Sequence, residues 1–517
     1  MNLKIQGTTK CNILLFSTII AFSGIISCAN VFSNPNYNRR RNVIVHLFEW
    51  KFNDIADECE RFLAPNGYAG VQVSPVTENV IVENRPWWER YQPISYKFIT
   101  RSGNESEFKS MVNRCNRVGI RIYVDMVFNH VTGTSGTIIG TGGSTANVEK
   151  LEYPSIPYGP EDFHKPACNI NNYNDPNEVR NCKLVGLPDL NQTKQVVQEK
   201  IVDLMNKLID IGVAGFRIDA AKHMWPSDLS SIFTRLNNVN GTIFPANSKP
   251  YIYQEVIDMG GEAIKKTEYT FLGAVTEFRY SKEIGRAFNG RNQLKWLRSW
   301  GPEWGLLPSQ DAFVFVDNHD NQRSNDGDIL THKSRQHYIM AVAFMLSHPY
   351  GTPRVMSSFE FKTFDQGPPA QSNGEIMSPE INNATEQCTN GWVCEHRWPE
   401  IRKMIKFRNA VGNAPVYGWW DNPDASNQIA FCRGTRGFIA FNNELFDLNA
   451  KLFTCMPSGI YCDAITGELS NGKCTGQQVY VDENGEAQIR VAPENGVLAI
   501  HIRTRRNFQP EIIMRLK

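Results

Sequence analysis

The sequence predicts an α/β protein: a (β/α)8 TIM barrel with a small subdomain inserted after the third strand and an antiparallel β-sandwich at the C-terminal end. Short β-branched runs alternate with amphipathic stretches of helical period, which is typical of a parallel sheet covered by helices. Eight such runs lie between residues 43 and 357, as a barrel with an insertion requires. The expected strands are Val43–Leu47, Gly70–Ser74, Ile120–Val127, Gly212–Asp219, Tyr251–Val256, Gly273–Phe278, Ala312–Asp317 and Pro353–Ser357.

The stretches between the expected strands indicate a helix and an insertion. Asn104 followed by Glu107 forms a capping-box pattern before an apolar run, which predicts a helix between strands two and three. The gap between strands three and four is longer than a crossover needs and is rich in Gly, Ser, Thr, Asn and Pro. Its glycine-rich piece at 136–145 has no strand before it and no helix after it, so we expect a surface loop and not a phosphate site.

The chain after Gly412 changes to strand and turn signals without helices, which predicts a separate β domain. We therefore expect five parts. They are a signal peptide at 1–29, a barrel at 40–129 and 191–412, an inserted subdomain at 130–190, an all-β domain at 413–503 and a tail at 504–517.

The first 29 residues have the layout of a cleaved secretory signal. Lys4 and Lys10 precede an apolar run that ends in Ser27-Cys28-Ala29, and this run is too short to span a bilayer. An uncleaved anchor and a bacterial lipid attachment at Cys28 are the alternatives. We expect a secreted, extracellular protein with no membrane partner.

Composition and charge favour a neutral substrate. The chain is 41% hydrophobic and 21% charged, so it can bury a large core. Cleavage after Ala29 would change the formal net charge from +1 to −1, which gives no reason to bind nucleic acid. Cleavage would also leave ten of the twelve cysteines, an even number that favours disulfides on an exported chain. Four glycosylation sequons fit export and begin at Asn104, Asn191, Asn240 and Asn383.

Four of the expected strands end in acidic residues, at the end of the barrel where the reactive groups of this fold lie. The strings are YVDMVFNH (123–130), GFRIDAAKH (215–223), YQEVID (253–258) and VFVDNHD (314–320). One acid at such a place more often caps the next helix. Several acids that converge from separate strands are costly unless they are used. Glycoside hydrolysis needs such convergence, because one carboxyl protonates the leaving oxygen while another acts on the anomeric carbon.

These strings, with NVIVHLFEW (42–50) and RPWWERYQP (85–93), closely resemble the animal α-amylases, a chloride-dependent group of glycoside hydrolases with a (β/α)8 barrel. The resemblance runs from about Asn42 to about Ile502. It implies a secreted, endo-acting hydrolase that cleaves internal α-1,4-glucosidic bonds with retention of configuration. The implied substrates are starch, glycogen and maltooligosaccharides, and we expect a monomer.

The resemblance implies separate tasks for three carboxylates. Asp219 matches the nucleophile that forms a covalent glycosyl-enzyme, Glu255 the general acid/base, and Asp320 the carboxylate that grips and distorts the sugar. Arg217 lies two residues before Asp219, so in a strand both side chains face the same way. We expect its charge to keep Asp219 ionised. Glu255 must instead carry a proton near neutral pH.

Other residues match the substrate-binding positions of the family. Trp87 and Trp88 match an aromatic platform on which glucose rings stack, although two adjacent tryptophans taken alone are more often packing residues. A lone histidine is likewise usually structural. The implied set is Trp87, Trp88, Tyr91, Gln92, His130, Arg217, Lys222, His223 and His319.

Calcium and chloride are the two ions that the resemblance implies. The implied calcium ligands are Asn129, Asp189 and the carbonyl oxygens of Arg180 and His223. Oxygen ligands suit calcium, and they would fasten the insertion to the barrel. The implied chloride ligands are Arg217, Asn318 and Arg354. The alternative is that the two arginines are structural. A bound anion would disfavour ionisation of Glu255.

Disulfide pairing follows from the same resemblance. The implied bonds are Cys59–Cys115, Cys168–Cys182, Cys388–Cys394 and Cys462–Cys474. Cys432 and Cys455 remain, in successive β segments, so we expect a fifth bond between them by elimination.

Three segments depart from the family pattern. Mammalian members carry a glycine-rich mobile loop after the third carboxylate, whereas this chain reads NQRSNDGDILTH at 321–332, so we expect that loop to be shortened or absent. The run Arg39–Arg41 is expected to be a solvated arm, with a processing site as the alternative. The tail at 504–517 extends past the usual end of the family, without a functional account.

Two other functions compete with this interpretation. A carbohydrate-binding or scaffold protein can keep the barrel and lose catalysis, but such proteins typically lose a carboxylate, and all three are present here. A maltase or a transglycosylase is the nearer alternative. The aromatic pair and the long insertion favour long polymers as substrates.

Overall fold

The computed structural model describes residues 30–506, so the expected signal peptide and most of the expected tail lie outside the described residues. Eight parallel strands close into a barrel in the order β1-β12-β11-β10-β9-β8-β5-β2. Seven of the predicted runs contain one of these strands, and the eighth overlaps β12, which begins one residue earlier than expected. The strands are β1 (Ile44–Leu47), β2 (Gly70–Val73), β5 (Arg121–Met126), β8 (Gly215–Ile218), β9 (Tyr251–Gln254), β10 (Ala274–Thr276), β11 (Ala312–Val314) and β12 (Thr352–Ser357).

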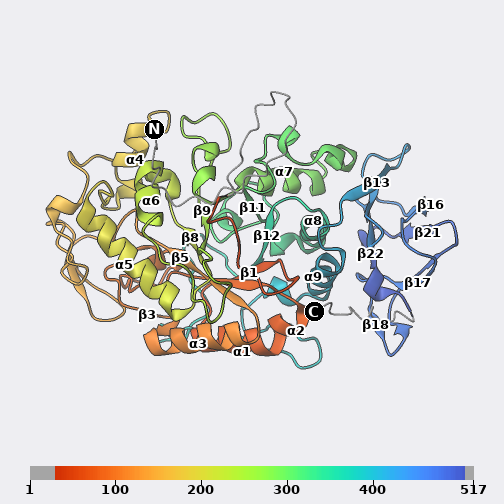
Figure 1. Ribbon diagram of the computed structural model, residues 1–517, viewed down its shortest axis with the longest axis horizontal. Coiled ribbons are helices and arrows are strands. Elements are labelled where there is room, and N and C mark those ends of the chain that lie inside the picture. The colour runs from red at the N-terminus through yellow and green to blue at the C-terminus, as the bar shows by residue number, and fades with distance from the viewer. Residues whose placement is uncertain (1–29, 507–517) are drawn as a thin grey trace, which may run out of the picture.

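The barrel strands are buried on both faces because helices cover the outside and side chains fill the inside (Figure 1). The predicted capping box begins α3, where Asn104 Oδ1 accepts the N–H groups of Ser106 and Glu107, and Glu107 accepts the N–H of Asn104. The helices are α1 (Phe52–Glu58), α2 (Ala64–Asn66), α3 (Glu105–Arg117), α4 (Pro176–Asn181), α5 (Gln195–Ile211), α6 (Pro226–Phe233), α7 (Phe278–Phe288), α8 (Arg335–Ser347) and α9 (Pro399–Val411).

The segment between β5 and β8 forms the predicted insertion, which carries α4 and a short hairpin of β6 (Thr137–Ile139) and β7 (Thr145–Asn147). The glycine-rich piece is therefore not a loop throughout. Its turn is held by the Glu78 carboxylate, which accepts the N–H groups of Gly142 and Ser144 at 2.8 and 2.9 Å. Glu78 lies 64 positions before Gly142 and 66 positions before Ser144 in the sequence, so no local pattern indicates these contacts.

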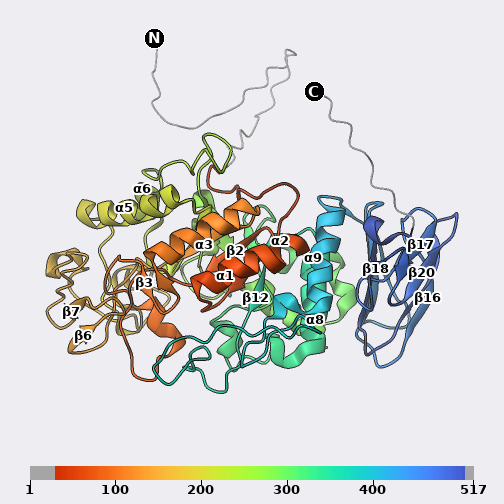
Figure 2. The ribbon, with the colours of Figure 1, turned by 90° about the horizontal axis from the view of Figure 1, so that it is seen from below.

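The last domain is all β and lies beside the barrel, with α8 and α9 on the side of the barrel that faces it (Figure 2). Its four-stranded antiparallel sheet packs against α8, where Phe344 contacts Phe431 and Phe441. That sheet has the order β13 (Val416–Asp421), β14 (Gln428–Arg433), β15 (Gly437–Asn442) and β22 (Val497–His501). Smaller antiparallel pairs are β16 (Leu448–Phe453) with β21 (Glu486–Val491), β17 (Gly459–Cys462) with β20 (Gln478–Val481), β18 (Leu469–Ser470) with β19 (Lys473–Cys474), and, near α3, β3 (Ile99–Thr100) with β4 (Gly103–Asn104).

All five expected disulfides are present, including the Cys432–Cys455 bond that was reached by elimination. Cys59–Cys115 joins the segment after α1 to α3, and Cys168–Cys182 closes a loop inside the insertion. Across residues 30–506 the structure contains no helix with both the length and the apolar character needed to cross a bilayer.

Candidate active site

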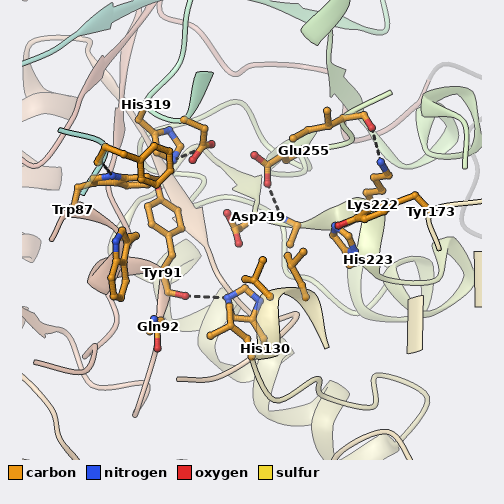
Figure 3. A pocket seen from close by; sticks show the side chains of 18 of the residues that line it. Trp87, Tyr91, Gln92, His130, Tyr173, Asp219, Lys222, His223, Glu255 and His319 are labelled. Carbon is orange, nitrogen blue, oxygen red and sulfur yellow. Dashed lines mark hydrogen bonds and ion pairs between the residues drawn. The ribbon is translucent and has the colours of Figure 1, made fainter. Parts of the chain in front are cut away.

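A cavity of about 730 Å³ opens at the carboxyl ends of the barrel strands. In Figure 3, Asp219 and Glu255 lie near its centre, with Trp87 and Tyr91 on one side and Lys222 on the other. The cavity brings together most of the residues that the sequence analysis singled out. Those that line it are Trp87, Trp88, Tyr91, Gln92, His130, Asp219, Lys222, His223, Glu255, His319 and Asp320.

The buried Arg217 connects the carboxylates at the floor of this cavity. Its Nη1 donates to Asp219 Oδ1 at 2.8 Å and to Asp125 Oδ1 at 2.6 Å, and its Nη2 donates to Glu255 Oε1 at 2.5 Å. The register explains this convergence, because Arg217 on β8 lies opposite Asp125 on β5 and opposite Tyr253 on β9, two residues before Glu255. One guanidinium therefore fixes the separation of the two proposed reacting carboxyl groups.

The turn after β8 holds the other oxygen of Glu255. Ala220 adopts a left-handed backbone conformation, with φ of 50°, and its N–H donates to Glu255 Oε2 at 2.8 Å. The N–H of Lys222 donates to the Glu255 carbonyl oxygen at 3.1 Å. Both oxygens of the Glu255 side chain are thus held by fixed donors, which orients the carboxyl group before a substrate arrives.

Burial and several neighbouring charges together set the pKa of Asp219. Burial raises the pKa of the Asp219 carboxyl well above its ordinary value, and the Arg217 guanidinium opposes that effect without overcoming it. The negative charges of Glu255 and Asp125 raise it further. Arg217 thus favours the ionised form of Asp219, as expected, but burial opposes it and the same arginine is shared among three carboxylates.

Asp320 is the most open of the three carboxylates. Its side chain is 38% exposed, against 10% for Asp219 and 11% for Glu255. Asn318 Nδ2 donates to Asp320 Oδ2 at 3.4 Å, and His319 Nε2 lies 3.4 Å from the same oxygen. Asp320 is therefore free to accept hydrogen bonds from a ligand in the cavity.

An aromatic wall flanks the carboxylates, as the sequence suggested for the tryptophan pair. The Tyr91 ring stacks on the His319 ring at 5.0 Å, and Tyr91 Oη donates to Asp125 at 2.9 Å. Trp87 Nε1 donates to the Phe364 carbonyl oxygen at 2.8 Å, and Trp88 Nε1 donates to an oxygen of the next residue, Asp365, at 2.7 Å. These bonds satisfy the polar edges of both indoles and leave apolar ring surface toward the cavity.

The two histidines from the insertion side are also fixed by carbonyl oxygens. His130 Nε2 donates to Tyr91 O at 2.9 Å, and His223 Nδ1 donates to Val179 O at 3.0 Å. Burial lowers the pKa of each imidazole to about 4, so both are neutral near pH 7. The second ring nitrogen of His130 accepts from Asn129 Nδ2 at 3.3 Å, whereas that of His223 forms no hydrogen bond among residues 30–506.

Asp125, which pairs with Arg217, was missed by the sequence analysis, as were several residues that line the cavity. Asp125 lies in the quoted string YVDMVFNH, and the alternation of strand side chains would have placed it beside Arg217. The lining residues that were missed come from loops whose path no pattern indicates, apart from Ala220 and Ile257, which lie in the quoted strings. They are Tyr173, Leu184, Val185, Leu187, Ala220, Ile257, Glu262 and Phe364.

Two of the expected calcium ligands, Asn129 and Asp189, lie where the insertion joins the barrel. Asn129 Oδ1 and Asp189 Oδ1 are buried without a hydrogen-bond partner among the described residues. An antiparallel bridge joins His130 to Asp189, and the bond between His223 and Val179 brings α4 to the turn after β8. Buried oxygens without donors are costly unless a cation or water meets them, so these residues fit a calcium ion. Among residues 30–506, no group of three or more His, Cys, Asp or Glu side chains is placed to hold a metal ion.

Of the three expected chloride ligands, Arg354 has donors that the described residues leave unpaired and that fit a bound anion. Arg354 is buried and donates from Nη1 to Gln72 at 2.7 Å, while its Nε and Nη2 have no partner within residues 30–506. Arg217 and Asn318 both donate to catalytic-site carboxylates instead. Two buried, unpaired N–H groups of a cationic side chain fit an anion.

Comparison with known proteins agrees with this architecture. Residues 61–390 match the alpha-amylase catalytic domain family, and residues 419–503 match the alpha-amylase C-terminal all-beta domain family. An alpha-amylase of Tenebrio molitor is 57% identical over 472 residues, which cover 91% of this chain and 99% of that protein. An alpha-amylase-related protein of Drosophila willistoni is 56% identical, over 90% of this chain and 95% of that protein.

Solved structures give the same answer. The crystal structure of alpha-amylase I from Eisenia fetida matches with a TM-score of 0.85 and 44% identity, covering 90% of this chain and 98% of that one. A glutamate-to-glutamine variant of the earthworm protein, in complex with maltohexaose, matches with a TM-score of 0.86 and 45% identity over the same shares. With its eight-stranded barrel, its acid-lined cavity and its all-β last domain, this chain belongs to the alpha-amylase family.

Proposed function

We propose that this protein is a secreted α-amylase that hydrolyses internal α-1,4-glucosidic bonds of starch and glycogen with retention of configuration. The observation that carries the proposal is the Arg217 guanidinium, which holds Asp219 and Glu255 side by side beneath an aromatic wall. Retaining glycosidases need two neighbouring carboxyl groups, because one attacks the anomeric carbon that the other helps to release.

In the proposed reaction Asp219 and Glu255 act in turn on the same glucosidic bond. The Asp219 carboxylate attacks the anomeric carbon while the Glu255 carboxyl gives its proton to the leaving oxygen, which forms a covalent glycosyl-enzyme on Asp219. Glu255 then takes a proton from water, which attacks the anomeric carbon and releases Asp219. Asp320, on the open side of the cavity, binds sugar hydroxyls and favours the distorted ring.

The raised pKa of Asp219 belongs to the free protein. When Glu255 takes up a proton, one of the negative charges that raise the pKa of Asp219 disappears, and Arg217 is shared between two carboxylates in place of three. Protonation of Glu255 and ionisation of Asp219 are therefore coupled, and the proposed reactive state has one proton on the pair.

The shape and lining of the cavity support a long glucan as substrate. Trp87, Trp88 and Tyr91 offer ring faces on which glucose units stack, and the cavity is open to solvent where a polymer continues past the cleavage point. The maltohexaose complex of the earthworm relative supports maltooligosaccharides as shorter substrates. We propose that the protein acts as a monomer.

Calcium and chloride complete the proposed enzyme. Asn129, Asp189 and the carbonyl oxygens of Arg180 and His223 would hold calcium, which would tie the insertion to the barrel. Arg354, with Arg217 and Asn318, would hold chloride, whose charge would favour the protonated form of Glu255. The five disulfides support folding in an oxidising, extracellular setting.

The test is the hydrolysis of soluble starch by Glu255→Gln and Asp219→Asn. Each substitution removes one proposed reacting group and keeps its shape, so we expect kcat to fall by at least about 10²–10⁴-fold with the KM little changed. The matched control is Glu483→Gln, an exposed turn residue of the last domain, which should retain wild-type kcat. Full activity of Glu255→Gln would contradict the assignment, and products of inverted configuration would contradict the covalent step.

A further inference from the structure

A second cavity, of about 520 Å³, lies at the opposite end of the barrel from the catalytic cavity. Its walls are the segment before β1, the carboxyl end of α9 and the turn between β14 and β15, so it lies where the barrel meets the last domain. The charged residues that line it are Arg39, Arg40, Arg41 and Arg436. Three asparagines, Asn42, Asn409 and Asn413, add polar lining, and no Asp or Glu of the described chain lines it.

Two of these arginines are held in place by backbone carbonyl groups. Arg41 Nη1 donates to Val118 O at 3.0 Å, and its Nη2 donates to Ala64 O at 3.3 Å. Arg436 Nε donates to Ala410 O at 2.9 Å, at the end of α9. The sequence suggested a solvated arm at Arg39–Arg41. The structure corrects this, because the Arg41 side chain is bonded to the barrel. The bonds position guanidinium groups at the cavity wall, and carbonyl oxygens leave the positive charge without a counterion.

The charge of this cluster is uncompensated within the described residues. None of its four arginines forms an ion pair with an acidic side chain of residues 30–506, whereas other arginines, such as Arg114 and Arg397, do. Besides burial, the charge of Arg39 lowers the pKa of Arg41, which shows that the two positive charges repel each other. The net charge of the whole chain is only +1, so the cluster is a local feature and not the result of a basic composition.

The basic surface continues into a neighbouring cavity of about 330 Å³, which shares Asn409. Lys403, Lys406 and Arg503 line it, with one acid, Glu468. After burial, the charges of Arg436 and Arg40 are the causes that lower the pKa of Arg503, so Arg503 belongs electrostatically to the first cluster.

We propose that the cavity between the barrel and the last domain is a binding site for an anion that carries two or more phosphate or sulfate groups. Guanidinium groups bind such oxyanions through paired N–H donors, and several arginines around one cavity match several anionic groups on one ligand. A neutral glucan has no charged group for this cluster. The site is therefore separate from hydrolysis at the other end of the barrel, and it does not depend on the proposed function.

The experiment is isothermal titration of the full protein with two probes, glucose 1,6-bisphosphate and sucrose octasulfate. The variant Arg39→Gln/Arg40→Gln removes two exposed charges of the cluster. The matched control, Arg61→Gln/Arg490→Gln, removes two charges whose side chains are 77% and 70% exposed elsewhere on the surface. We expect saturable binding of one equivalent of probe, weakened at least about tenfold in the first variant and unchanged in the control.

The two probes separate the sources of the ligand. Binding of the bisphosphate indicates a small phosphorylated molecule, and binding of the octasulfate alone indicates a sulfated glycan. Affinity should fall as potassium chloride is raised, because the contacts are ionic. No saturable binding of either probe, or equal weakening in the variant and the control, would overturn the proposal. Starch hydrolysis by both double variants should equal that of the wild type, which verifies their folding.

Discussion

Arg217 and Arg354 lie near one another on the barrel floor, but their surroundings differ. Burial disfavours the charge of Arg217, but the carboxylates that pair with it on three sides outweigh burial and hold its pKa well above the ordinary value. Burial and the charge of Arg217 instead lower the pKa of Arg354, and two of its nitrogens lack partners among residues 30–506. A buried arginine in that condition is costly unless an anion meets it. Arg217 therefore positions the proposed reacting groups, whereas the surroundings of Arg354 fit a bound anion.

The chloride proposal predicts a shift in the pH dependence of hydrolysis. Removal of an anion near Glu255 makes its ionisation easier, so the basic limb of the kcat profile should move to lower pH in chloride-free buffer. Arg354→Gln should need a higher chloride concentration to restore the wild-type profile, while the exposed control Arg298→Gln should not. The measurement is a chloride titration of starch hydrolysis at several pH values. Activity that is unchanged by exhaustive dialysis against chloride-free buffer would rule the proposal out.

At the scale of elements, a buried ionic contact joins the first helix, α1, to the short helix that precedes α9. Glu58, at the end of α1, lies 2.8 Å from His396 Nε2 and accepts from Arg397 Nε at 2.8 Å, across more than 330 residues of sequence. Both partners belong to the short helix at Glu395–Arg397 that precedes α9. Burial alone would raise the pKa of Glu58, but His396 and Arg397 outweigh it and lower the pKa below its ordinary value.

This contact predicts a pH-dependent loss of stability in Glu58→Gln. At pH 7 the variant leaves Arg397 buried without its counterion, which should cost about 3–5 kcal/mol of unfolding free energy. Because the folded pKa of Glu58 is depressed, its contribution is full above its ordinary pKa and is lost as pH falls through the folded value. Urea unfolding at pH 7 and at pH 4 or below should therefore show a difference that narrows with acid.

The control for that measurement is Glu60→Gln, two residues away. Glu60 pairs with Arg114 on the surface, where its side chain is 34% exposed, and exposed pairs contribute little. A loss in Glu58→Gln no larger than in Glu60→Gln would show that the buried contact does not hold α1 to the end of the barrel.

On the scale of the whole molecule, three parts of the chain must be held together: the barrel, the insertion and the last domain. The last domain packs on α8 through aromatic side chains. The apolar sequence of α8 explains this packing. The insertion has instead a polar junction with the barrel, where Asn129 and Asp189 present buried oxygens without donors. The position of the insertion relative to the catalytic cavity should therefore depend on the proposed calcium ion.

Calcium removal is accordingly predicted to destabilise the insertion first. A chelator should lower the Tm and expose residues 130–190 to limited proteolysis, because binding to the folded state alone stabilises it. Asp189→Asn should lower the Tm without chelator and respond less to it, whereas Glu161→Gln, an exposed change within the same insertion, should behave as the wild type. Identical melting of the wild type with and without chelator would contradict a structural calcium ion.

The sequence by itself determined the barrel, the order of its strands, the capped start of α3 and the acids at the strand ends. These follow from local periodicity, and parallel strands must bring their carboxyl ends to one mouth. Only the tertiary structure decided that Arg217 serves Asp219 and Glu255 together, that Phe364 and Tyr173 reach the cavity, and that Arg39–Arg41 meets Arg436. Such contacts join residues far apart in sequence through strand register and loop path, and the pKa of Asp219 depends on burial that a local pattern does not encode.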